Sequence, residues 1–284
     1  MSAFGKISIY VLMGLLIISL SSFANPKREI VREFDKKELV SLKTVSGDCI
    51  IKTGKTDKII VKVTNEYSPR DSFEPRFREQ NNSLRIKEKL YGSNRGSATW
   101  IITVPEGTEI DFSSASGGIM VQDYTGEIRG NTASGDYEIL NCKGLFRLNT
   151  ASGYYGIENC QGEFDINSAS GDIDAHDLVI TNESEFNTAS GNVKVSLGST
   201  LEHDLNISTA SGRAVLDFKG NKIVGFFEMT AKYDHGRIDA PFEFDDVEKF
   251  RKHGQRYIMK SFTKETDEPF ISIETASGRA TLRE

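Results

Sequence analysis

Apolar and polar residues alternate along most of the chain, and the alternation restarts at regular intervals. After Gly135 it puts Tyr137 and Ile139 on one side of an extended strand, and eighteen residues later Tyr155 and Ile157 repeat the pattern. A period of two predicts strands that turn one face to a dry core and the other to water. We therefore expect an all-β protein built from short strands.

A four-residue motif divides this pattern into units. Thr-Ala-Ser-Gly, or a variant with Ser in the first place or Val in the second, recurs eight times, ending at Gly47, Gly117, Gly135, Gly153, Gly171, Gly191, Gly212 and Gly278. A unit of roughly 18 residues cannot bury its apolar face alone, so successive units must stack. The predicted fold is a β-solenoid of roughly 18-residue coils whose equivalent strands pair in parallel.

The residue types of the motif fit a tight corner. Glycine can adopt positive φ, and Ser and Thr hydroxyls bond nearby backbone groups. Four of the motifs are preceded by asparagines, which we expect to stack as a ladder of hydrogen-bonded amides: Asn131, Asn149, Asn167 and Asn187. Such a row could form a ligand-binding ridge, but turn chemistry accounts for each member and is the interpretation adopted.

The strongly apolar segment at residues 7–20 has the layout of an export signal. It follows Lys6 and precedes Ser22-Phe23-Ala24, and it is shorter than the ~20 apolar residues that a spanning helix needs. We predict a signal peptide over residues 1–24 and export to the periplasm, cell surface or extracellular space. No transmembrane segment is expected after cleavage.

Two further regions follow the predicted signal. Residues 25–110 lack the strict repeat and are expected to form irregular N-terminal β coils and a cap. Residues 111–284 are expected to form the repetitive solenoid, with an inserted loop at about residues 244–268. That loop carries a candidate partner-binding cluster of Lys249, Arg251, Lys252 and Arg256, although a plain capping loop explains it equally well.

The charge balance argues against a nucleic-acid partner. Removal of residues 1–24 leaves 34 basic and 41 acidic residues, a net charge of −7, whereas phosphate binding needs concentrated Lys and Arg. The four histidines lack metal-ligand spacing, and the sequence contains no phosphate loop or nucleophile elbow. We therefore expect no metal, no cofactor and no enzymatic activity.

One group of acidic residues could carry chemistry. These side chains occupy outward places just after the corners of neighbouring units: Asp136, Glu138, Glu158, Asp172, Asp174 and His176. They could bind carbohydrate or a cation, or supply the paired carboxylates of a polysaccharide lyase or hydrolase. Outward positions of a stacked sheet are usually charged for solubility, and that interpretation is preferred.

Two cysteines occupy the same place in adjacent units. Cys142 and Cys160 would lie about 4.8 Å apart, within reach of a disulfide, but their parallel side chains also suit two stacked buried thiols. Cys49 is expected to face inward as well. A catalytic thiol is not expected, because the repeat ties no histidine to any of the three.

The repeated Ser-Gly corners, the strand that ends in Val104-Pro105-Glu106-Gly107 and the signal peptide together resemble the bacterial toastrack family, an adhesin-type domain of unknown function with β-helix repeats. The resemblance implies a single-stranded right-handed β-helix outside the cytoplasmic membrane and supplies no catalytic residues. It favours an adhesin-like binding or scaffold module of the cell envelope, with an envelope protein or polysaccharide as partner. The alternatives are a polysaccharide-active β-helix enzyme and an envelope-stress sensor or regulator that binds a partner protein.

Overall fold

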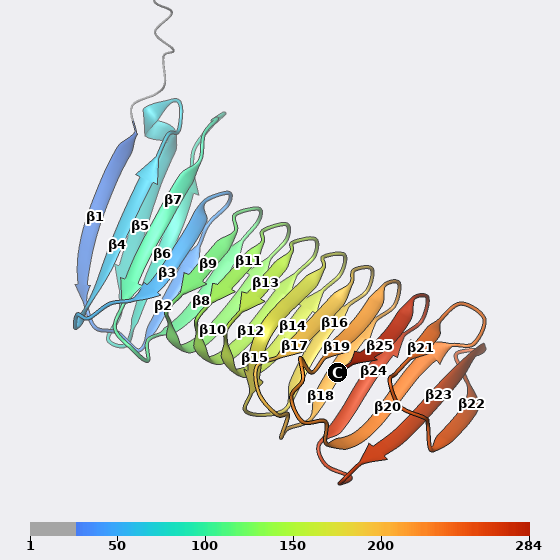
Figure 1. The fold of residues 1–284 in the computed structure, drawn as a ribbon. Coiled ribbons are helices and arrows are strands. Elements are labelled where there is room, and N and C mark those ends of the chain that lie inside the picture. Colours follow the sequence, from blue (N-terminus) through green and yellow to red (C-terminus); the bar gives the residue numbers. More distant parts are fainter. Residues whose placement is uncertain (1–26) are drawn as a thin grey trace, which may run out of the picture.

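The computed structural model describes residues 27–284, so the predicted signal peptide lies outside the described residues. Within that range the chain is all-β, as predicted, apart from the 3-10 turn η1 (Arg70–Ser72). Its strands run side by side along an elongated stack (Figure 1). No helix in this part of the chain is long and apolar enough to cross a membrane.

One long sheet, sheet A, contains the strands that follow each glycine corner. In spatial order it comprises β1 (Arg28–Asp35), β4 (Lys58–Asn65), β7 (Ala98–Val104), β3 (Asp48–Thr53), β9 (Ile119–Gln122), β11 (Tyr137–Leu140), β13 (Tyr155–Glu158), β15 (Ile173–Ile180), β17 (Val193–Leu197), β19 (Arg213–Asp217), β25 (Arg279–Arg283) and β21 (Arg237–Asp239).

The second sheet, sheet B, contains the strands that lead into each corner. In spatial order it comprises β5 (Phe73–Glu79), β6 (Ser83–Leu90), β2 (Leu39–Lys43), β8 (Glu109–Ser114), β10 (Thr125–Thr132), β12 (Lys143–Thr150), β14 (Gln161–Ser168), β16 (Ser184–Thr188), β18 (Leu205–Thr209), β24 (Phe270–Thr275), β20 (Gly225–Lys232), β23 (Gln255–Lys264) and β22 (Asp246–Lys252).

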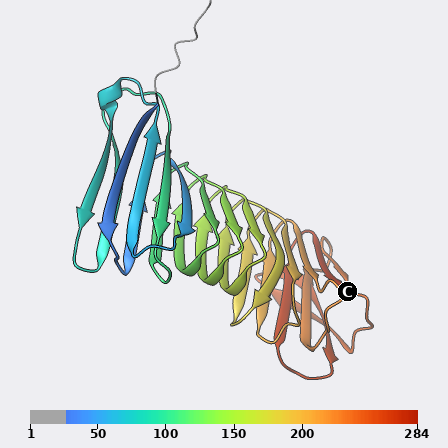
Figure 2. The same ribbon diagram turned by 60° about the vertical axis from the view of Figure 1, so that its left-hand side comes forward.

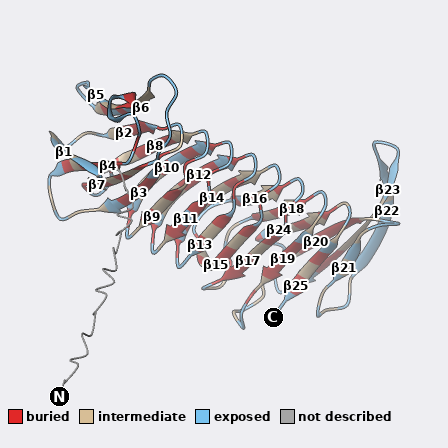
Figure 3. Ribbon diagram, turned by 90° about the horizontal axis from the view of Figure 1, so that it is seen from above, coloured by how far each residue is buried: buried red, intermediate tan, exposed pale blue. Residues whose placement is uncertain are grey.

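Equivalent residues of successive turns lie directly over one another in the middle of the stack. Tyr137 is the parallel partner of Tyr155, and Ile139 is the partner of Ile157. All four are at most 1% exposed, and the two tyrosine rings stack with centroids 4.9 Å apart. The predicted alternation therefore places its apolar members in one continuous core, which appears as buried bands across the strands in Figure 3.

The glycine corners have a different cause from the one predicted. None of the eight corner glycines has positive φ, so the expected left-handed conformation is wrong. A Cβ on Gly153 would instead overlap the carbonyl oxygen of Gly135 in the turn below. Thr150 completes the corner by accepting the Gly153 N–H at 3.0 Å. Glycine is needed because successive backbones touch at the corner.

Left-handed backbone occurs instead at the opposite corner of each turn. Asp123, Asn141 and Asn159 have φ between 50° and 55°, a conformation that Asn and Asp tolerate better than most residues. Their side chains form a ladder, in which Asn141 donates to Asp123 at 3.3 Å and Asn159 donates to Asn141 at 2.8 Å. The sequence analysis missed this ladder.

The predicted asparagine ladder before the glycine corners is only partly formed. Asn149 donates to Asn131 at 3.3 Å, and Asn187 donates to Asn167 at 3.3 Å. Between these pairs, Asn167 donates to Asp165 of its own strand at 2.6 Å. A neighbouring carboxylate is a stronger acceptor than an amide, so it interrupts the row.

The order of turns in space differs from their order in the chain at both ends. β2 and β3 stack directly on β8 and β9, so Gly47 lies against Gly117 although about seventy residues separate them. Similarly, β24 and β25 stack on β18 and β19, which brings Gly278 against Gly212. The residues between these contacts form the two ends of the stack.

Antiparallel strands terminate both sheets at the N-terminal end and sheet B at the C-terminal end, where the short parallel strand β21 is the last strand of sheet A. At the N-terminal end β1 pairs with β4, β4 with β7, and β5 with β6, forming the panel of blue and cyan strands in Figure 2. At the C-terminal end β23 pairs with both β20 and β22. The predicted insertion at 244–268 contains the whole β22–β23 hairpin, which is largely exposed (Figure 3).

Candidate functional site: the outer face of sheet A

The outward side chains of the central strands of sheet A fall into three rows that run along the stack. Row one follows the glycine corner and contains Asp136, Tyr154, Asp172, Asn192, Arg213 and Arg279. Row two contains Glu138, Gly156, Asp174, Lys194, Val215 and Thr281. Row three contains Leu140, Glu158, His176, Ser196, Asp217 and Arg283. These three rows are called the outer face.

All six predicted site residues lie on this face, in the half that belongs to the middle of sheet A. The same positions on β17, β19 and β25 carry basic side chains, so the face changes from acidic to basic along the stack. The basic members are Lys194, Arg213, Arg279 and Arg283. Sequence reasoning missed them because it stopped at the acidic units. Reading the same places after Gly191, Gly212 and Gly278 would have found them.

The exposed side chains of row one also bind the backbone of the next turn. The carboxylate of Asp136 accepts the backbone N–H of Tyr154 at 2.7 Å, and Asp172 accepts the N–H of Asn192 at 2.7 Å. The side chain of Asn192 in turn accepts the N–H of Arg213 at 3.2 Å. These bonds tie one turn to the next, so one oxygen of Asp136 and of Asp172 is already occupied.

Tyr154 stands among the acidic members of the face. Its side chain is 42% exposed. Partial burial raises the pKa of the Tyr154 hydroxyl, and the negative charges of Asp174, Asp172 and Glu138 raise it further. The phenol therefore stays protonated at neutral pH and can donate a hydrogen bond beside three carboxylates.

Asp174, His176 and Ser196 form a short polar chain. His176 Nε2 lies 2.8 Å from a carboxylate oxygen of Asp174, and His176 Nδ1 lies 3.3 Å from Ser196 Oγ. The order resembles that of a hydrolase triad, but Ser196 is 2% exposed and its Oγ accepts the backbone N–H of Asp177 at 3.2 Å. A buried hydroxyl in this position links two strands and cannot reach a substrate.

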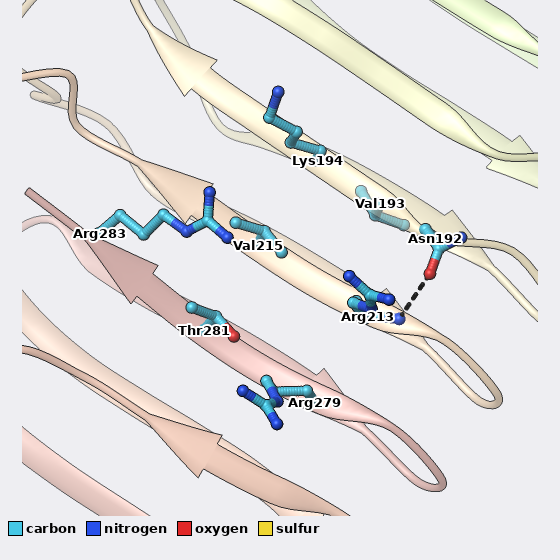
Figure 4. Close-up of a pocket in the computed structure, with 8 residues that line it drawn as sticks. All are labelled: Asn192, Val193, Lys194, Arg213, Val215, Arg279, Thr281 and Arg283. Atoms are coloured by element: carbon cyan, nitrogen blue, oxygen red, sulfur yellow. Dashed lines mark hydrogen bonds between the residues drawn. The ribbon is translucent and has the colours of Figure 1, made fainter.

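The basic members surround a hollow of about 540 Å³ on the outer face (Figure 4). Lys194 comes from β17, Arg213 from β19, and Arg279 with Arg283 from β25. Thr281 also lines the hollow, as do Asn192, Val193 and Val215. Three adjacent strands thus contribute cations to one depression.

The cysteines lie in the core and do not contribute to a surface site. Cys142, Cys160 and Cys49 are free thiols that are at most 1% exposed, and the disulfide considered from the sequence is not formed. The Cys142 N–H donates to Cys160 Sγ at 3.4 Å, which is the stacked arrangement. Burial raises the pKa of the Cys49 thiol, and the negative charge of Asp48 adds to this.

Two cations of the candidate partner cluster hold the C-terminal hairpin against the stack. Arg256 forms two 3.0 Å bonds to the carboxylate of Asp234, and its guanidinium lies 5.1 Å from the ring centre of Tyr233. The ammonium of Lys249 lies 4.9 Å from the same ring. These contacts join β22 and β23 to the corner that precedes β21.

The other two cations of that cluster differ in their surroundings. Lys252 Nζ lies 3.9 Å from a carboxylate oxygen of Glu274, a long contact between exposed groups. Arg251 has no ion pair among residues 27–284. Within the same range, no group of three or more His, Cys, Asp or Glu side chains is arranged to hold a metal ion.

Comparison with known proteins finds a family match in the central part of the stack. The Toastrack DUF4097 family matches residues 108–232. No curated protein matches the chain.

Solved structures with similar arrangements include two described as adhesins. A "putative adhesin" from Bacteroides fragilis is 13% identical, with 91% of this chain and 98% of that chain covered and a TM-score of 0.49. A "putative adhesin" from Parabacteroides merdae is 10% identical, with coverage of 91% and 96% and a TM-score of 0.33. A "putative lipid binding protein" from Parabacteroides distasonis is 17% identical, with coverage of 66% and 90% and a TM-score of 0.41.

Proposed function

We propose that the stack, whose residues 108–232 match the Toastrack DUF4097 family, is an exported, adhesin-like binding or scaffold module of the cell envelope. It acts by presenting the outer face of sheet A to an envelope polymer or protein. Export is supported by the signal-like segment at residues 7–20. A right-handed winding of the stack is part of the proposal, because parallel strands joined by a crossover take that hand in almost all cases.

The regular spacing of the outer face carries the proposal. Strands β11 to β25 of sheet A pair on both sides, so their backbones are held by hydrogen bonds across the whole face. Equivalent side chains therefore recur at the strand spacing of about 4.8 Å. A rigid row of this kind suits a ligand that is itself repetitive, because little conformational entropy is lost when it binds.

The proposal includes no catalysis. The residues that most resemble a nucleophile are enclosed: Ser196 and the three thiols are at most 2% exposed. Asp136 and Asp172 each have an oxygen bound to backbone N–H groups of the next turn. Glu138, Glu158 and Asp174 remain as exposed or half-buried carboxylates, which suits solubility and polar recognition.

The test combines a binding assay with an activity assay. The purified exported chain is immobilised and exposed to envelope extracts and to a panel of purified neutral and charged polysaccharides. We expect retention of at least one polymer or protein, and no shortening of any polysaccharide after long incubation. Release of oligosaccharides that is lost in Asp174→Asn would replace the proposal with a polysaccharide-active enzyme. Absence of both binding and release would refute both readings.

A further inference from the structure

We infer that the basic end of the outer face is a binding site for an acidic polysaccharide, whose carboxylate or sulfate groups are held by Lys194, Arg213, Arg279 and Arg283. This inference rests on the proposed function and names the ligand class for one part of the face. The four cations surround the hollow of Figure 4, with their charged groups on the solvent side of sheet A.

The register of the strands sets the positions of the cations. Arg213 on β19 is the direct parallel partner of Arg279 on β25, and Arg283 lies two outward places further along β25. Lys194 lies on β17, the strand next to β19, where it is the partner of Val215. Adjacent partners are about 4.8 Å apart across the strands, so the charges form a small grid. An acid group placed over the hollow can contact cations from more than one strand.

Most of these cations have little internal compensation. Among residues 27–284, Lys194, Arg213 and Arg283 form no ion pair, whereas Arg279 lies 3.1 Å from Asp239 in a contact that is about half exposed on both sides. Asp217, the register partner of Arg283, is the acid of row three beside them. The acids beside these four cations are Asp217, Asp239 and Asp174, the register partner of Lys194, so the local charge is still positive within a chain of net charge −6. Guanidinium groups match carboxylate and sulfate oxygens with two parallel hydrogen bonds.

The floor of the hollow is partly apolar and enclosed. Val215 points outward by the strand alternation, yet it is 7% exposed and stands outside the buried core cluster. Arginine and lysine commonly lay their aliphatic stems over such a side chain and leave the charged end in water. The hydroxyl of Thr281 and the amide of Asn192 lie at the same depression and can bond sugar hydroxyls. The site therefore combines cations, neutral polar groups and a small apolar floor.

Other polyanions fit these surroundings less well. No aromatic side chain lines the hollow, so bases of a nucleic acid would have no stacking surface. β17, β19 and β25 are each paired on both sides, so an acidic peptide could not add itself as a strand. A polysaccharide needs neither feature, because it is recognised through its hydroxyl and acid groups along a shallow surface.

The acidic middle of the same face restricts how a polyanion lies on the molecule. Glu138, Asp172 and Asp174 occupy the rows that continue into the basic end. A long polyanion aligned with the stack would meet these carboxylates, so its acid groups are held at the basic end alone. The acidic part could instead contact the basic part of a second copy, and the experiment must separate that case.

The experiment measures binding to three polysaccharides, two of which share the dextran backbone, by surface plasmon resonance. The probes are polygalacturonate, dextran sulfate and neutral dextran. We expect the wild-type chain to bind at least one acidic polymer and to bind neutral dextran much more weakly. The variant Arg213→Gln/Arg283→Gln should lose roughly tenfold in affinity, with a weaker dependence on salt. The matched control is Arg32→Gln/Arg78→Gln, which removes the same charge from exposed positions of the N-terminal cap.

The outcomes separate this inference from the broader proposal. Melting temperatures of both variants equal to that of the wild type ensure that the fold is intact. If both variants bind an envelope polymer as the wild type does, the adhesin-like module stands and the acidic-polysaccharide site is refuted. If single-stranded DNA binds as well as the acidic polymers and with the same loss in Arg213→Gln/Arg283→Gln, the choice of a polysaccharide is wrong.

Self-association supplies a further decisive result. Sedimentation equilibrium at low salt is expected to give a monomer. A dimer that dissociates in Glu138→Gln/Asp174→Asn would show that the basic end is covered by the acidic part of a second copy, and this would overturn the inference.

Discussion

The middle of the stack and its two ends differ in how their strands pair through backbone hydrogen bonds. In the middle, every strand of sheet A pairs in parallel with its equivalent, and glycine corners lie in contact. At the ends, the chain leaves the repeat and returns as antiparallel strands with longer side chains and more charge. Parallel pairing with touching glycine corners therefore extends the stack, whereas antiparallel strands end it.

The ends protect the molecule from further stacking. β1, β5 and β22 each pair with one neighbour within the described residues, and each is rich in Arg, Lys, Glu or Asp. β5 also contains Pro75, which has no N–H to donate. Charged and proline-bearing edge strands discourage the addition of another chain. A regular middle would otherwise present a surface that accepts its own copies.

The largest effect is expected at the contact between corners. In Gly153→Val the new side chain would overlap the Gly135 carbonyl, and neither backbone can move without breaking the stack. We expect no cooperatively folded protein, as judged by circular dichroism during thermal unfolding. The control is Gly156→Ala in the same turn, where the nearest contact of a Cβ is the ring of Tyr154 at 3.2 Å. Equal melting of the two variants would contradict the packing of the corners.

The aromatic column of the middle should matter more than the aromatic pair of the hairpin. Tyr155→Ala removes a ring that is 0% exposed and stacked on Tyr137, so we expect a loss of about 3–5 kcal/mol in urea unfolding. Phe250→Ala removes a half-buried ring that stacks on Tyr257 at 5.7 Å, and a loss below about 1.5 kcal/mol is expected. The reverse order would mean that the hairpin, not the stack, limits stability.

A smaller effect is expected from the bonds that tie one turn to the next. Asp172→Ala removes the acceptor of the Asn192 N–H and should cost about 1 kcal/mol. Asp174→Ala on the same strand removes no acceptor of a backbone N–H and should stay within about 0.5 kcal/mol. Urea unfolding of the two variants side by side tests whether row one is structural. Identical stabilities would remove that distinction.

The smallest effect is expected in the hairpin that caps the C-terminal end. Arg256→Ala breaks the exposed pair with Asp234, so the global stability should fall by less than about 1 kcal/mol. Amide hydrogen exchange should nevertheless become faster in β22 and β23, while β11 and β13 keep their protection. Arg251→Ala is the control, because its side chain has no ion pair in the described residues. Faster exchange throughout the molecule would show that the cap and the stack unfold as one unit.

Much of the regular middle could be predicted because each turn repeats the same local requirements. Tyr137 and Tyr155 were expected to lie over one another, and they do. The reason for the corner glycines could not be predicted, since a motif of Ser, Thr and Gly suits both a left-handed turn and a close approach of two backbones. The backbone conformation of the corner and the short distance between Gly135 and Gly153 distinguish these.

The candidate face was predicted in part. The alternation identified the outward carboxylates around Asp172 and Asp174, but it could not show that Asp172 is held by the next turn whereas Asp174 is turned toward His176. Those differences depend on where neighbouring backbones stand. Lys194 and Arg213 of the basic end could be recognised in the sequence. The other two cations join them only because β25, from much later in the chain, pairs with β19.

The sequence by itself determined the strands, their inward side and the stacking of the regular units, because a short alternating unit has no other way to shield its apolar side. Only the tertiary structure decided which turns are neighbours at the ends. Gly47 meets Gly117, and Gly278 meets Gly212, because the intervening segments fold outward into antiparallel caps. Which turns become neighbours depends on which strand edges pair across long stretches of chain, and local sequence patterns do not encode that pairing.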